Sequence, residues 1–109
     1  YNLYNLTSLN LSYNRIEELF PEIGLLTNLV ELRLNHNKLS GLPSTIGKLT
    51  KLQTITLNIN PLEFIPEEIG LLVNLIEFTI SKSKIYLIPK SVKLPVIDCL
   101  RSNVSVSIN

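Results

Sequence analysis

A pattern of eleven residues occurs four times along the chain at a constant spacing. Each copy has an aliphatic or aromatic residue at its first, fourth, sixth and eleventh positions, and asparagine or serine at its ninth. The copies begin at Leu6, Leu29, Leu52 and Leu75, so the period is 23 residues. A constant period of this size predicts structural units that stack on one another, each of which contacts only its neighbours. Such a chain offers a partner an extended surface rather than a deep pocket.

Within each copy, apolar and polar residues alternate over a few positions. This period of two is typical of a short β-strand with one buried face. Strands that follow one another through connections of equal length should pair in parallel, and such crossovers are nearly always right-handed. The inward-facing pairs predicted in this way are Leu9/Leu11, Leu32/Leu34, Ile55/Leu57, Phe78/Ile80 and Ile97/Cys99.

The second half of each repeat carries a further pattern, L-P-x-x-I-G-x-L-x-x-L, seen from Leu42 to Leu52 and, with Ile65 at its first position, to Leu75. Together the two patterns resemble the leucine-rich repeat family, in its 23-residue subclass of plant, protist and bacterial intracellular proteins and Ras-associated scaffolds. The resemblance implies an α/β solenoid, a right-handed coil with a concave parallel β-sheet and short 3₁₀ or helical turns on its convex side. Residues 1–109 would form one domain of about four and a half repeats, cut from a larger protein.

The resemblance also assigns roles to the polar and turn residues. Asparagines at the ninth position should form a ladder that satisfies backbone groups at each bend, and it should weaken towards the C-terminus, where serine replaces asparagine. The convex turn should begin at a proline and be limited by a glycine. In the first repeat Phe20 stands where proline is expected, with Pro21 one place late, so we expect a local distortion there. Phe20 and Phe64 are interpreted as core packing. The ladder residues are Asn14, Asn37 and Asn60, followed by Ser83 and Ser102.

The polar positions of each strand and of the bend after it should form columns across the concave face. One column places Tyr13, His36 and Ile59 side by side at about 4.8 Å spacing, as an exposed ridge. Aromatic and arginine side chains dominate the energetics of interfaces. The alternative is that Tyr13 and Ile59 only cover their own repeats, and that Glu31/Arg33 and Glu77/Lys82 are solvated neighbours that neutralise one another. The candidate partner-binding residues are Tyr13, Arg33, His36, Thr56, Ile59 and Lys82.

Composition and residue placement exclude several classes of function. Ten basic and nine acidic residues are scattered along the chain, so no basic footprint for nucleic acid is present. No apolar run approaches the roughly 20 residues of a membrane span. His36 and Asp98, the only residues of their types, would lie about 14 Å apart, too far for a catalytic relay. A single histidine without a cysteine partner predicts no metal site, and no cofactor is expected.

The lone cysteine, Cys99, permits no internal disulfide. Repeat proteins of this kind that are secreted usually have disulfide-bonded ends, so the absence favours a reducing, cytoplasmic location. Three glycosylation sequons, at Asn5, Asn10 and Asn103, support the alternative of an extracellular recognition domain.

The resemblance implies a protein–protein interaction module that binds a protein partner through its concave face. It would be the recruiting or regulatory segment of a signalling protein. The alternative is an accessory domain of a signalling enzyme, such as a type 2C protein phosphatase, kinase or cyclase, whose catalytic domain lies elsewhere. Neither end of the sequence shows a polar cap, so end-to-end self-association is also expected.

Overall fold

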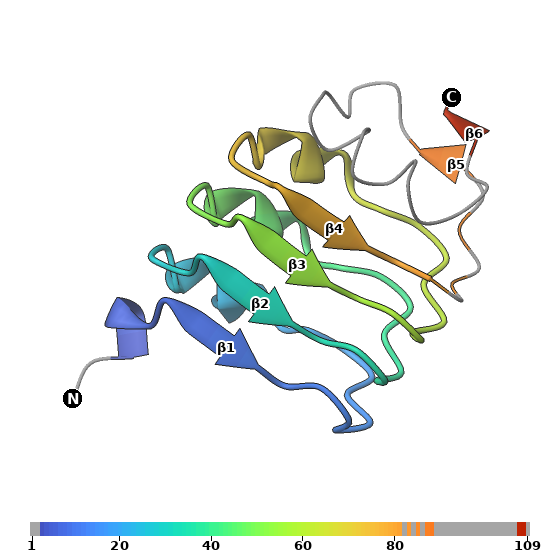
Figure 1. Cartoon of the computed structure of the whole chain (residues 1–109). Helices are drawn as coiled ribbons and strands as arrows, with labels where there is room; N and C mark the ends of the chain where they lie inside the picture. Colours follow the sequence, from blue (N-terminus) through green and yellow to red (C-terminus); the bar gives the residue numbers. More distant parts are fainter. Residues whose placement is uncertain (1–2, 82, 84, 86, 89–106, 109) are drawn as a thin grey trace.

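A computed structural model of the chain describes residues 3–81, 83, 85, 87–88 and 107–108. It shows successive coils stacked side by side, with a strand of each coil on one side and a 3₁₀ turn on the other (Figure 1). The strands are β1 (Ser8–Asn10), β2 (Glu31–Arg33), β3 (Thr54–Thr56), β4 (Glu77–Thr79), β5 (Leu87–Ile88) and β6 (Ser107–Ile108). The 3₁₀ turns are η1 (Leu3–Asn5), η2 (Pro21–Leu25), η3 (Ser44–Lys48) and η4 (Glu67–Leu71).

Strands β1 to β4 form one parallel sheet in sequence order, which confirms the predicted solenoid. Each residue pairs with the residue 23 positions later, as Leu9 with Leu32 and Ile55 with Phe78. Within the described part of the chain, β5 and β6 make a separate parallel pair. The predicted strand at Ile97 and Cys99 lies outside the described residues.

The core is a stack of aliphatic columns that runs through the coils without interruption. Leu32, Ile55 and Phe78, which are register partners on β2, β3 and β4, are all fully buried. Leu9 occupies the same position on β1 and is only partly buried, because it is covered from one side within the described chain. Each coil therefore depends on its neighbours for its buried surface, as the period predicted.

The asparagine ladder is present and connects adjacent coils. Asn37 Oδ1 accepts hydrogen bonds from the backbone N–H groups of Asn14 at 3.0 Å and Ile16 at 2.9 Å. Its Nδ2 donates to the carbonyls of Leu11 and Leu34, both at 3.0 Å. One buried side chain thus satisfies donors and acceptors in two coils, where the bend leaves the backbone without sheet partners.

The equivalent Asn60 repeats this arrangement one coil later. Its Nδ2 donates to the carbonyls of Leu34 and Leu57, and its Oδ1 accepts from Leu39 N–H. At Ser83 the shorter side chain accepts a hydrogen bond from Ile85 N–H at 3.4 Å, within the fourth coil itself. The predicted continuation at Ser102 lies outside the described residues.

The convex turns begin at equivalent positions in all three coils, and the expected distortion at Phe20 is wrong. Phe20 has φ −71° and ψ 151°, almost identical to the angles of Pro43 and Pro66 in the following coils. The physical reason is Pro21, the first residue of η2. Proline is well suited to the first position of a helical turn, and it restricts the residue before it to extended angles.

The repeated glycines let these turns pack closely. Gly24 lies inside η2, one residue before its end, and a Cβ atom there would come within 2.8 Å of Thr45 Cβ and 2.9 Å of Thr45 O on the next turn. Gly47 faces Glu68 of η4 in the same way. Neither glycine has a positive φ, so its function is close approach rather than backbone freedom. Among the described residues, no helix has the length and apolar character to cross a membrane.

Candidate binding surface

The predicted ridge of Tyr13, His36 and Ile59 lies at the carboxyl end of the strands, one residue before each asparagine of the ladder. Backbone hydrogen bonds hold the three positions side by side. The N–H groups of Tyr13, His36 and Ile59 donate to the carbonyls of Asn35, Asn58 and Ser81, at 2.9, 2.8 and 2.9 Å respectively. We call these three side chains the apolar ridge.

The two aromatic members of the ridge contact one another. The rings of Tyr13 and His36 are stacked with their centroids 4.2 Å apart and an angle of 16° between their planes. Tyr13 nevertheless remains 72% exposed, while His36 and Ile59 are half-buried. A stacked pair of this kind contributes about 0.5–1.5 kcal/mol beyond the area that it buries, so it holds both rings in a fixed orientation. The ridge therefore presents a stacked aromatic pair, of which Tyr13 is the exposed member.

All three ridge residues have a left-handed backbone conformation. Their φ angles are 63° for Tyr13, 55° for His36 and 61° for Ile59. This region is unfavourable for residues other than glycine and asparagine, and most of all for a β-branched residue such as isoleucine. The asparagine ladder and the backbone hydrogen bonds on either side determine the bend, so the side chains are held there at a conformational cost.

A second polar ladder runs beside the ridge and was missed by the sequence analysis. Asn35 N–H donates to Ser12 Oγ, Asn58 N–H to Asn35 Oδ1, and Ser81 N–H to Asn58 Oδ1, at 2.8–3.1 Å. Each side chain thus satisfies the backbone of the next coil. The sequence did contain a signal for this ladder. Short side chains that can form hydrogen bonds recur every 23 residues, at Ser12, Asn35, Asn58 and Ser81. These residues fix the base of the ridge rather than contribute free polar groups to the surface.

Arg33 is paired within its own strand. Its guanidinium Nη2 donates to Glu31 Oε2 at 2.9 Å, and Ser8 Oγ donates to Glu31 Oε1 at 3.0 Å. The hydrogen bond from Arg33, followed by that from Ser8, lowers the pKa of the Glu31 carboxyl from its ordinary value. The neutralising interpretation of this pair therefore has structural support, and the Arg33 side chain remains 35% exposed.

The candidate set needs one correction. Thr56 is only 3% exposed, so its side chain cannot contact a partner directly. It is a short side chain on β3, with β2 and β4 on either side. Lys82, the last candidate, lies outside the described residues. The structure places Tyr13, His36 and Ile59 side by side, whereas Arg33 is paired with Glu31 on β2.

The interpretation of Phe20 and Phe64 as core packing is also wrong. Phe20 is 66% exposed and Phe64 is 55% exposed, on the segments that lead from the ridge side towards the convex turns. Alignment of the repeats contained the relevant signal, because Phe64 is equivalent to Glu18 in the first coil. The described residues include no cluster of three or more side chains that could hold a metal ion.

Comparisons with known proteins agree with this architecture. A family model described as leucine rich repeat matches residues 4–62, which is more than half of the chain. A comparison with curated proteins gives no match.

A solved structure of a leucine-rich repeat protein from Leptospira interrogans is similar to 97% of this chain, with 37% sequence identity and a TM-score of 0.80. The similar region is 25% of that protein, so this chain spans about a quarter of its length. The constant register of β1 to β4, the asparagine ladder and the family match lead to one conclusion. The chain belongs to the leucine-rich repeat family.

Proposed function

We propose that this chain binds a protein partner through its concave face, with the apolar ridge and Arg33 at the centre of the contact. Leucine-rich repeat domains are in general protein–protein interaction modules and are typically not catalytic. What supports the assignment to this face is the conformational cost of the ridge. A stacked Tyr13–His36 pair and a β-branched Ile59 are held at φ angles where asparagine or glycine would be more stable.

Strained positions that carry aromatic and aliphatic side chains are explained well by a role in recognition. Tyrosine and arginine are enriched among residues that dominate binding energy, and a rigid aromatic loses little conformational entropy on binding. Arg33 is the last residue of β2, three residues before His36, and its apolar stem would extend the surface of the ridge. The proposed contact therefore combines a preformed apolar centre with a partly neutralised charge.

Asparagine substitutions test the ridge without damage to the bend. The combined variant Tyr13→Asn, His36→Asn and Ile59→Asn removes the apolar side chains, and asparagine tolerates the left-handed region. We expect its free energy of unfolding to stay within about 1 kcal/mol of the original, because relief of strain offsets the lost stack. In an affinity capture from the native source, we expect the protein partner to be lost.

The matched control changes two exposed apolar residues of the convex side to asparagine, Leu71 and Val73. This control should still capture the partner. A partner retained by the ridge variant and lost by the convex control would show that recognition does not use the ridge.

The wider role is a further part of the proposal. The chain would be the recruiting segment of a signalling protein in the cytoplasm, without nucleic-acid or membrane binding. The alternative, an accessory domain of a signalling enzyme, has the same binding surface and differs only in the sequence that flanks it. A flanking metal-binding aspartate set or kinase motif would favour the alternative.

End-to-end self-association has one supporting observation. Leu3, Tyr4, Phe20 and Leu25 are more than half exposed, and they surround the partly covered side of the first coil. An apolar coil end of this kind gains buried area when it stacks on another coil. We expect the apparent mass of the chain in analytical ultracentrifugation to rise with concentration. The combined variant Tyr4→Lys and Leu25→Lys should remain monomeric, and equal association of both forms would contradict self-association through this end.

A further inference from the structure

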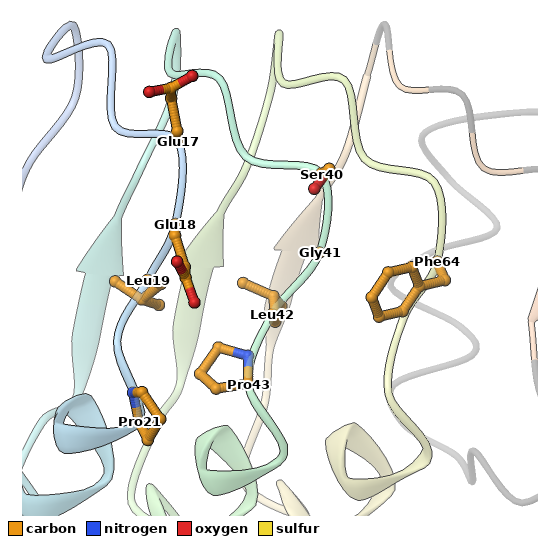
Figure 2. A pocket seen from close by; sticks show the side chains of 9 residues that line it. All are labelled: Glu17, Glu18, Leu19, Pro21, Ser40, Gly41, Leu42, Pro43 and Phe64. Atoms are coloured by element: carbon orange, nitrogen blue, oxygen red, sulfur yellow. The ribbon is translucent and has the colours of Figure 1, made fainter.

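A groove lies on the side of the solenoid where each coil descends from the ridge to its convex turn. It encloses about 320 Å³ between the first and second coils, with the ring of Phe64 from the third coil at its margin (Figure 2). Leu42 and Pro43 contribute apolar surface, and Glu17 and Glu18 are placed along the opposite wall. This descending groove shares no lining residue with the apolar ridge, so the proposed function does not account for it.

Three equivalent positions in successive coils shape the groove. Glu18, Gly41 and Phe64 are separated by 23 residues each, so at the spacing of the coils the first and third lie about 10 Å apart. The glycine in the middle leaves the space that the Phe64 ring occupies. A Cβ atom on Gly41 would lie 2.4 Å from Phe64 Cζ and 2.7 Å from Cε1, so the ring lies across the glycine. The result is an open slot between a carboxylate and an aromatic ring.

The descending side is predominantly acidic. Residues 16–24, 39–47 and 61–71 contain six carboxylates and no lysine or arginine, while Arg15, Lys38 and Lys48 lie immediately beyond these ranges. The residues that line the groove include Glu17 and Glu18 and no basic residue. In the described part of the chain, no salt bridge neutralises their carboxylates. The whole chain has a net charge of +1, so the acidic character of this side is a local segregation. The six acidic residues concerned are Glu17, Glu18, Glu22, Glu63, Glu67 and Glu68.

We infer that the descending groove binds a basic peptide segment of a protein partner, with a lysine or arginine side chain between the Phe64 ring and the Glu17/Glu18 carboxylates. A cation is attracted to the face of an aromatic ring, and its charged head can form hydrogen bonds with carboxylates. The aliphatic stem of the same side chain and apolar neighbours in the peptide would contact Pro43. Nucleic acid and anionic lipid have the wrong charge for this site.

The test uses the 109-residue chain labelled with ¹⁵N and a capped hexapeptide in which leucine and arginine alternate. We expect saturable changes of chemical shift at Glu18, Gly41 and Phe64, and weaker binding at higher salt. A peptide with citrulline in place of each arginine keeps the shape and removes the charge, and it should bind at least about fivefold more weakly. Equal binding of the two peptides would overturn the proposal, and so would the absence of shift changes at several millimolar peptide.

Two substitutions separate the role of the ring from that of the fold. Phe64→Ala removes an exposed ring and should weaken binding about two- to fivefold. Gly41→Ala leaves Phe64 in the sequence but displaces the ring from the slot, and it should weaken binding similarly while the midpoint of urea unfolding stays equal or rises. If both variants bind as tightly as the original chain, the ring has no part in recognition.

Charge and position are tested by a matched pair of substitutions. Glu18→Gln should weaken binding of the arginine peptide, whereas Glu77→Gln, which removes the same charge from an exposed position on β4, should leave it almost unchanged. Equal effects of the two substitutions would mean that only net charge matters. The asparagine variant of the apolar ridge should bind the peptide normally, so failure of this inference and failure of the proposed concave function can be told apart.

Discussion

Replacement of Asn37 by alanine is expected to lower the free energy of unfolding by about 3–4 kcal/mol, since a buried group left without its hydrogen bond costs about 1–3 kcal/mol. The side chain is 6% exposed and connects two coils. Without it, the N–H groups of Asn14 and Ile16 and the carbonyl of Leu11 lose a partner at the bend. Urea titration followed by circular dichroism measures the change.

The same substitution at Asn14 is the matched control. Asn14 occupies the equivalent position in the first coil, but it is exposed, and its Nδ2 donates only to the nearby carbonyls of Leu11 and Ser12. Water can replace these bonds, so we expect a loss of at most about 1 kcal/mol. Equal losses for the two variants would show that the ladder does not stabilise the contact between coils.

The contrast between Asn37 and Asn14 also shows what the sequence could and could not reveal. Both residues stand at the ninth position of their repeats, and this shared position identified them as members of one ladder. Their different energetic weight depends on burial, which depends on the neighbouring coil rather than on the repeat itself. Periodicity assigns a role to a position, and the location of the coil in the stack determines how much that role contributes.

Two residues, Phe64 and Thr56, were placed wrongly, each for its own reason. Hydrophobicity alone placed Phe64 in the core, although the equivalent positions are Glu18 and Gly41, which are poor core residues. The alternation along the strand placed Thr56 on the binding surface, although this short side chain at the middle of the sheet is only 3% exposed. Alignment of the repeats against one another could have corrected the first error. The second needed the structure.

The left-handed conformation of the ridge was likewise beyond the sequence. Tyr13 and Ile59 are not residues that favour a positive φ, so no local preference shared by the three positions predicts it. The conformation follows from the requirement that the chain turn inward between two hydrogen-bonded ladders. Sequence analysis located the ridge correctly as a column, and the structure added the strain that makes it a candidate for recognition.

The second large effect is expected in the core column that connects the strands. Leu32→Ala should lower the free energy of unfolding by about 3–5 kcal/mol, because it removes a fully buried side chain and leaves a cavity between two coils. Leu32 lies between Leu9 on β1 and Ile55 on β3. The surrounding residues are held by their own register, so they cannot close the space. Urea unfolding provides the measurement.

Leu9→Ala makes the same chemical change at the equivalent position of the first coil, where the side chain is only partly buried. We expect a loss of about 1–2 kcal/mol, because folding of the original protein removes less apolar area of Leu9 from contact with water than of Leu32. The difference between the two variants measures the contribution of the second neighbouring coil to one leucine. Losses of equal size would mean that each coil is stable through its own contacts, and would contradict the dependence of every coil on the one beside it.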